Sequence, residues 1–203
     1  MASRRWCARC AQCQSATAGG HAQTGLTLLE LLIVLVIAGV LLGQVVPAFA
    51  RMAARNTLAA TANELLSVLH TARHTAVSRN RAVTFCAGTP QQGCHGDWAR
   101  GQWIVFLDRE ANGRLDAGET LLIAGALPSD SGIGLQGNGP FAAAVVFRPD
   151  GSARTANGAW AMGRLRVCVR SPSSVPATDL VLIASGRTVA QPLADSPPGC
   201  IPL

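Results

Sequence analysis

Apolar residues are concentrated in one segment near the N-terminus. Thirteen of them follow one another over residues 31–43, and the apolar character extends over residues 26–50 if Glu30 and Gln44 are allowed. A helix that crosses a membrane needs about 20 mostly apolar residues, and no other segment meets this length. The pattern therefore predicts one membrane-spanning helix.

The apolar pattern changes after Pro47. From there on, apolar side chains recur every three or four positions, with arginine, asparagine and serine between them. This is the spacing of a helix with one apolar face. We expect the helix to continue to about residue 80 and to pack this face against a domain. The apolar positions are Leu58, Ala62, Leu65, Leu66, Leu69, Ala72, Ala76 and Val77.

Residues 82–203 lose the helical period. Short apolar runs alternate with clusters of glycine, proline, asparagine and aspartate, as in strands joined by turns. The chain is thus predicted to have an α+β fold, with Trp98, Trp103 and Trp160 in the core of the β-rich part. The expected strands lie at 82–86, 102–107, 120–124, 145–148, 164–169, 180–184 and 188–189, with turns at 88–96, 110–118, 128–140, 149–151 and 171–178.

The amino-acid composition limits the classes of protein to which the chain can belong. Charged residues make up 14% of the chain and hydrophobic residues 49%, which excludes disorder as the main description. Aromatic residues are 4%, with no tyrosine, which argues against a stacking platform for nucleic acid. The net charge is +6, but Arg4, Arg5 and Arg9 contribute to it from an N-terminal stretch without acidic residues. The basic balance is therefore weak evidence for a polyanionic partner.

Three explanations fit the apolar segment. The first is a cleaved secretory signal, since Ala48, Phe49 and Ala50 form an A-x-A pattern. The second is a plain membrane anchor, which leaves Glu30 without a role. A carboxylate inside a span costs about 2.5–3.5 kcal/mol and usually marks a function with a partner group. The third explanation supplies that partner.

The residues around Glu30 resemble a known processing site. Residues 25–30, GLTLLE, followed by the apolar run, resemble the site of type IV pilins and type II secretion pseudopilins. The resemblance implies that a prepilin peptidase cuts after Gly25 and that the new N-terminus, Leu26, is methylated. Phenylalanine is usual at the position of Leu26. Glu30 would then meet the terminal amine of an adjacent subunit, and Pro47 occupies a position where pilin helices commonly carry proline.

The rest of the chain resembles the GspH/FimT family of minor pseudopilins and minor pilins. The resemblance is carried by residues 76–86 (AVSRNRAVTFC), 101–106 (GQWIVF), 145–147 (VVF) and 185–187 (SGR). It implies a pilin-like α+β fold, in which a long N-terminal helix packs on a C-terminal antiparallel β-sheet domain. The implied parts are a leader (1–25), a transmembrane half-helix (26–50), a periplasmic amphipathic half-helix (51–81) and a periplasmic β-rich domain (82–203).

The same resemblance implies a structural role and no catalysis. The expected protein is a single-pass subunit of the bacterial inner membrane that assembles with other pseudopilins or minor pilins. We favour a GspH-like component of the type II secretion pseudopilus, with a FimT-like minor pilin of a type IV pilus as the alternative. Some FimT-like proteins bind DNA through a Gly-Arg-x-Arg motif. Here Gly186 and Arg187 are kept, but Val189 replaces the second arginine.

The cysteines indicate an oxidising compartment. Three of the seven lie in the implied leader, and the four others are an even number beyond the membrane span. Among three possible connectivities we favour Cys86–Cys94 and Cys168–Cys200, because each closes an excursion rich in glycine or proline. Free buried thiols are the alternative.

Catalytic and metal-binding patterns are lacking in the sequence. There is no G-x-S-x-G, phosphate-binding loop or zinc-ligand run, so no enzyme and no cofactor are expected. His70 and His74 are four residues apart, but the H-E-x-x-H pattern fails between them. Residues 108–119 have oxygen-bearing side chains at EF-hand spacing, except that Glu110 holds the third position. Because the flanks read as strands, we favour a polar hairpin loop over a calcium site and predict no metal.

Overall fold

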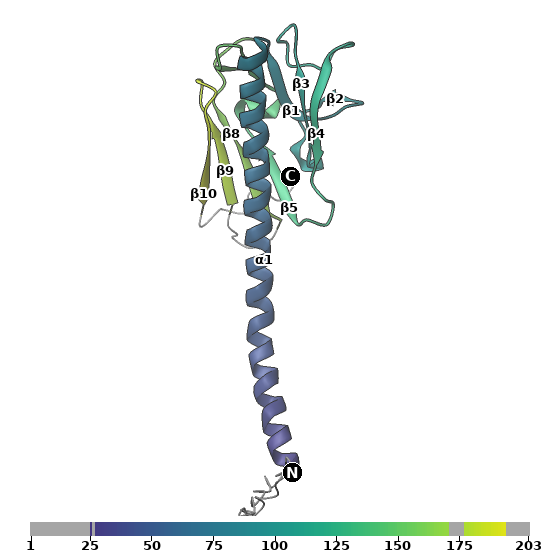
Figure 1. Ribbon diagram of the computed structural model, residues 1–203, viewed down its shortest axis with the longest axis vertical. Helices are drawn as coiled ribbons and strands as arrows, with labels where there is room; N and C mark the ends of the chain where they lie inside the picture. Colours follow the sequence, from purple (N-terminus) through teal and green to yellow (C-terminus); the bar gives the residue numbers. More distant parts are fainter. Residues whose placement is uncertain (1–24, 26, 171–176, 194–203) are drawn as a thin grey trace, which may run out of the picture. The chain divides into compact units, whose positions relative to one another are not determined.

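The long helix expected from the apolar patterns is present. The computed structural model describes Gly25 and residues 27–170 and 177–193, and in it α1 extends from Leu28 to Arg79 (Figure 1). The chain divides into two compact units, Met1–Val45 and Val46–Leu203. Each unit is described by itself.

In the first unit, α1 is apolar on all sides. Its large apolar side chains are exposed by fractions that range from 50% at Leu32 to 80% at Leu28. Of the described residues, α1 alone forms a helix with the length and hydropathy needed to cross a membrane. An all-round apolar surface on a helix of this length is typical of a membrane span.

Both ends of α1 are closed by local hydrogen bonds. At the start, the Thr27 hydroxyl oxygen accepts a bond from the N–H of Glu30 (3.2 Å), the arrangement of a helix N-cap. At the end, Asn80 has a left-handed backbone conformation (φ 50°), and the N–H of Arg81 donates to the carbonyl of Ala76 (3.2 Å). This is the pattern with which helices commonly terminate, and asparagine tolerates it well.

The second unit holds two antiparallel sheets. The first has the order β4-β3-β1-β6-β7, with the short β2 paired to β1, and the second has the order β10-β9-β8-β5. Two short 3-10 helices, η1 (Trp98–Arg100) and η2 (Gly139–Ala142), lie in the connections. The strands are β1 (Val83–Thr89), β2 (Gly93–Cys94), β3 (Gln102–Leu107), β4 (Thr120–Ala126), β5 (Ile133–Gly137), β6 (Val145–Phe147), β7 (Ala153–Arg154), β8 (Gly163–Val169), β9 (Ala177–Leu182) and β10 (Thr188–Leu193).

The core forms where the apolar face of α1 meets both sheets. Leu65 and Leu69 of the helix are fully buried in one cluster with Phe85 of the first sheet and Leu180 of the second. Ala72 and Ala76 of the helix are also fully buried in this cluster. Burying each large apolar side chain contributes about 1.5–3 kcal/mol. The helical spacing of Leu58–Val77 thus reflects a core helix, as predicted.

Several strands differ from the sequence-based expectation. The strand β5 lies inside the predicted turn 128–140, and β9 begins within the predicted turn 171–178. The sequence did not predict β5, because Gly134 and Gly137 within it favour a turn. In the structure β5 is an edge strand that pairs with β8. Trp98 and Trp103 are buried as expected, but Trp160 is 55% exposed and was wrongly placed in the core. Its ring instead faces the guanidinium of Arg154 at 3.3 Å.

Candidate functional site

The residues of the predicted processing site lie at the start of α1. Gly25 is exposed, and a side chain added there would meet none of the described residues within 4 Å. Leu26 lies outside the described residues. Glu30 is exposed in the first turn of α1, and its carboxylate has no ion-pair partner among the described residues. Pro47 lies within the helix, so it cannot donate the usual backbone hydrogen bond to Gly43.

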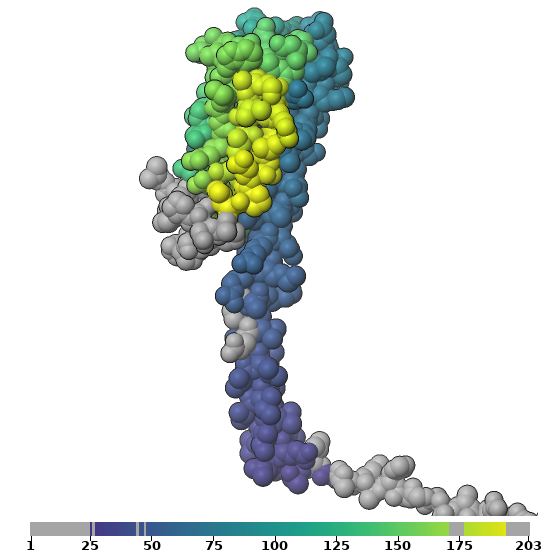
Figure 2. Space-filling model, turned by 90° about the vertical axis from the view of Figure 1, so that its left-hand side faces the viewer, coloured from purple at the N-terminus to yellow at the C-terminus, as the bar shows by residue number. Residues whose placement is uncertain are grey.

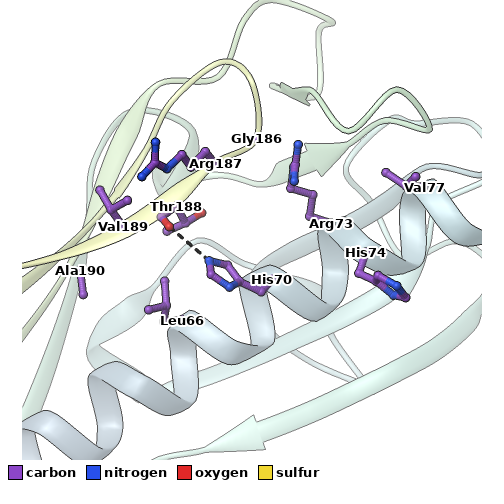
Figure 3. Close-up of a pocket in the computed structure, with 10 residues that line it drawn as sticks. All are labelled: Leu66, His70, Arg73, His74, Val77, Gly186, Arg187, Thr188, Val189 and Ala190. Atoms are coloured by element: carbon purple, nitrogen blue, oxygen red, sulfur yellow. Dashed lines mark hydrogen bonds between the residues drawn. The ribbon is translucent and has the colours of Figure 1, made fainter.

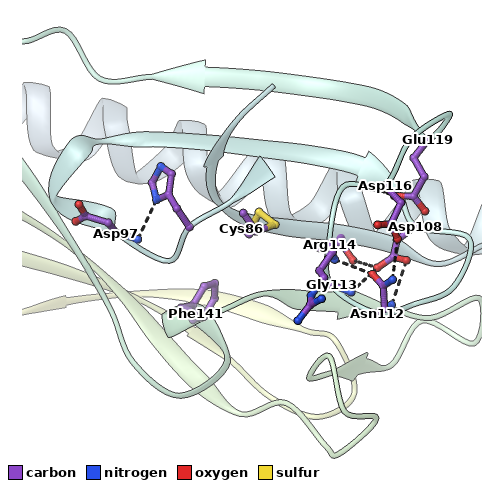
Figure 4. Close-up of a disulfide and its surroundings, with 12 residues drawn as sticks. Cys86, Asp97, Asp108, Asn112, Gly113, Arg114, Asp116, Glu119 and Phe141 are labelled. Atoms are coloured by element: carbon purple, nitrogen blue, oxygen red, sulfur yellow. Dashed lines mark hydrogen bonds between the residues drawn. A yellow bond between two sulfur atoms is a disulfide. The ribbon is translucent and has the colours of Figure 1, made fainter. Parts of the chain in front are cut away.

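One of the two favoured disulfides is present. Cys86 of β1 and Cys94 of β2 are bonded, with a Cα–Cα distance of 5.6 Å (Figure 4). The bond closes the hairpin between β1 and β2 beside the fully buried Phe106. Cys168 lies buried in β8, but Cys200 falls outside the described residues, so the second pairing stays a prediction.

Removing the Cys86–Cys94 bond is expected to destabilise the domain by about 2–3 kcal/mol, the chain-entropy value for so short a loop. Urea unfolding of the Cys86→Ala, Cys94→Ala double variant measures this loss. Each single variant should lose about as much as the double variant, because either one breaks the same bond. Unchanged unfolding of the double variant would contradict the prediction.

The loop at residues 108–119 is held by its own carboxylates (Figure 4). Asp108 is fully buried, and its Oδ2 accepts hydrogen bonds from the Thr84 hydroxyl (2.7 Å) and the Gly113 N–H (2.8 Å). At the other end, Glu119 accepts bonds from the N–H groups of Arg109 (2.8 Å) and Asp116 (3.0 Å). The oxygens at the positions of calcium ligands thus accept hydrogen bonds from N–H and O–H groups, as in a polar hairpin loop. The described residues contain no group of three or more side chains suited to a metal ion.

A partly buried ion pair joins two strands of the second sheet. Arg166 of β8 donates two hydrogen bonds to the carboxylate of Asp179 on β9, at 2.7 and 2.9 Å. These bonds raise the pKa of the Arg166 guanidinium, and its partial burial opposes the effect. Arg164 lies 3.8 Å from the same carboxylate. Both arginines are therefore partly neutralised, which makes them weak candidates for contacts with phosphate.

A groove of about 740 Å³ lies beside α1 in the second unit (Figure 3). Figure 2 shows the last strand, in yellow, next to the blue helix on this face. Arg187 is exposed at the groove, whereas the second arginine of the DNA-binding motif is replaced by Val189. The sequence pointed to Arg187 but not to the groove, because the two walls of the groove come from distant parts of the chain. The walls are Leu66, His70, Arg73, His74 and Val77 of the helix and residues 186–190.

Comparisons with known proteins agree with this architecture. A family model described as "Type II transport protein GspH" matches residues 61–186, and a model of the prokaryotic N-terminal methylation motif matches residues 20–43. No curated protein matches the chain. The fold is similar to two crystal forms of the type IV minor pilin FimU from Pseudomonas aeruginosa strain PAO1.

The two FimU structures share the fold at low sequence identity. One is 19% identical, with a TM-score of 0.52 over 72% of this chain and 97% of FimU. The other is 18% identical, with a TM-score of 0.50 over 71% of this chain and all of FimU (100%). The GspH model covers more than half of the 203 residues, including the buried face of α1 and most of both sheets. The chain therefore belongs to the GspH family of pilin-like structural subunits.

Proposed function

We propose that the chain is a minor pseudopilin of the type II secretion system, a structural subunit of the periplasmic pseudopilus. The observation that carries the proposal is the order of two matches along one chain. The methylation motif encloses Gly25 and Glu30, and the GspH match begins on the buried face of α1. One apolar helix supports a single-pass anchor in the inner membrane, with the β-domain in the periplasm. The Cys86–Cys94 disulfide supports the periplasmic location of the β-domain, because disulfides persist in an oxidising compartment.

In this proposal the prepilin peptidase cuts between Gly25 and Leu26. The exposure of Gly25 supports access by the enzyme. The carboxylate of Glu30, which has no ion-pair partner in the described part of the chain, would then bind the terminal ammonium of Leu26 on a neighbouring subunit. Such a pair compensates the cost of a charge in an apolar environment. Other pseudopilins or minor pilins are the partners.

The mature N-terminus tests this proposal. We expect mass spectrometry of the chain, produced with a prepilin peptidase, to find Leu26 as the first residue with one added methyl group. A Gly25→Val variant should remain uncut, because the bulkier side chain obstructs cleavage there. A mature chain that begins at Arg51 would instead indicate an ordinary signal peptide and overturn the proposal.

The second candidate is a minor pilin of a type IV pilus. The similarity of the fold to FimU supports it, since FimU is a type IV minor pilin. Loss of protein export on deletion of the gene, with piliation intact, favours the pseudopilus, and the reverse result favours the pilus. DNA uptake has less support, because Arg187 stands without the second arginine of the motif.

A further inference from the structure

The groove beside α1 includes an open sheet edge. Among the described strands, β10 is the last of its sheet and pairs only with β9. The N–H of Ile183 donates to the carbonyl of Arg187, which makes these two residues a hydrogen-bonded pair. Because such pairs alternate in antiparallel sheets, the backbone groups of Thr188, Ala190 and Pro192 point away from β9. An extended segment can pair with an edge of this kind.

The helix wall supports this orientation of the edge. His70 Nε2 lies 3.2 Å from the carbonyl oxygen of Thr188, so this outward carbonyl faces α1 (Figure 3). Ala190, two residues further along β10, is exposed. The Thr188 hydroxyl is buried at the groove and has no hydrogen-bond partner in the described part of the protein. Within the described residues, the edge is therefore exposed at Ala190, and the Thr188 hydroxyl beside it lacks a hydrogen-bond partner.

The groove is basic and lacks acidic residues. The partly buried guanidinium of Arg73 donates to two backbone carbonyls, of Gly151 (2.9 Å) and Ser185 (3.3 Å). Neither Arg73 nor Arg187 has a carboxylate within ion-pair distance among the described residues. His70 and His74 are the other ionisable groups that line it, and its apolar lining includes Val77, which is 49% exposed. The charge is complementary to an acidic ligand with some apolar side chains.

We propose that this groove binds an extended, acidic polypeptide segment, which adds as a strand to the β10 edge. The backbone of the segment pairs with Ala190, and a carboxylate side chain meets Arg187 and Arg73. Its apolar side chains cover Val77 and Val189. We assign the segment to a neighbouring subunit. In this point the inference rests on the proposed function, which it deepens.

Binding of a synthetic peptide to the full-length chain in detergent tests the proposal. The probe is a fluorescent, terminally blocked heptapeptide of alternating valine and glutamate, and the measurement is anisotropy. We expect saturable binding, and weaker binding by about tenfold or more when lysine replaces glutamate or when alternate backbone nitrogens are methylated. Equal binding of the lysine peptide, or no binding at millimolar peptide, would overturn the proposal.

Variants locate the binding site. Arg187→Gln should weaken binding about threefold, the effect of one exposed ion pair, whereas Arg114→Gln on a distant exposed loop should not. Ala190→Pro removes one outward N–H and should weaken binding about fivefold. A short DNA duplex that binds more tightly than the peptide, and loses affinity in Arg187→Gln, would overturn the peptide assignment in favour of nucleic acid. A chain that binds the peptide but starts at Arg51 contradicts the proposed function alone.

Discussion

Replacing Asp108 with alanine is expected to destabilise the β-domain by about 3–5 kcal/mol, because it leaves several buried donors without a partner. The Thr84 hydroxyl and the Gly113 N–H both lie in the buried interior and both donate to this carboxylate. The N–H of Asn112 is a third donor, at 3.2 Å. An alanine side chain accepts none of these bonds, and position 108 is fully buried.

Chemical unfolding of the purified chain, followed by tryptophan fluorescence, measures this loss. Asp116→Ala is the matched control, because this carboxylate is exposed in the same loop and accepts bonds mainly from Asn112. We expect it to cost less than about 1 kcal/mol. Asp108→Asn, which keeps one acceptor oxygen, should fall between the two. A loss below about 1 kcal/mol in Asp108→Ala would show that the loop is held in another way.

Removing the charge of Glu30 is expected to lower incorporation into filaments by a factor of at least about ten, the effect of losing one partner of a desolvated ion pair. Glu30→Gln is the informative change. Thr27 and Glu30 have the spacing of a capping box, in which glutamine serves as well as glutamate. The variant therefore keeps the local role at the helix start and removes only the interaction between subunits.

The measurement is the amount of the chain in sheared or cross-linked filaments, relative to the amount in the membrane. Glu64→Gln is a matched control, since Glu64 is also exposed on α1 but lies beyond the apolar run. It should assemble like the parent chain. If Glu30→Gln enters filaments equally well, Glu30 acts only in the helix cap and the proposed contact with a neighbouring N-terminus is wrong.

The sequence predicted the features that depend on local pattern. The extent of α1 followed from apolar spacing, and β1, β3 and β8 followed from runs of β-branched and aromatic residues. The excursion rich in glycine and proline between Cys86 and Cys94 indicated their disulfide. β5 escaped prediction because its glycines favour turns by themselves, and pairing with β8 outweighs that preference.

The functional surface was predicted less well than the fold. Asp108 was considered as a metal ligand because spacing alone cannot reveal which donors surround a carboxylate. The groove escaped prediction because Arg73 and Arg187 lie more than a hundred residues apart and meet only through tertiary packing. Arg187 was named from a resemblance, whereas the unpaired edge of β10 has no signature in the sequence.

Pro192 limits what the free edge of β10 can do. It sits at an outward-facing position and has no N–H to donate, while the outward carbonyl of Thr188, four residues earlier, already faces His70. A long, regular edge invites identical domains to join sheet to sheet and aggregate, and a proline shortens the stretch of edge that can pair, so that only a short segment fits beside Ala190. In the proposed pseudopilus, this proline would keep the β-domains of neighbouring subunits from joining edge to edge along β10.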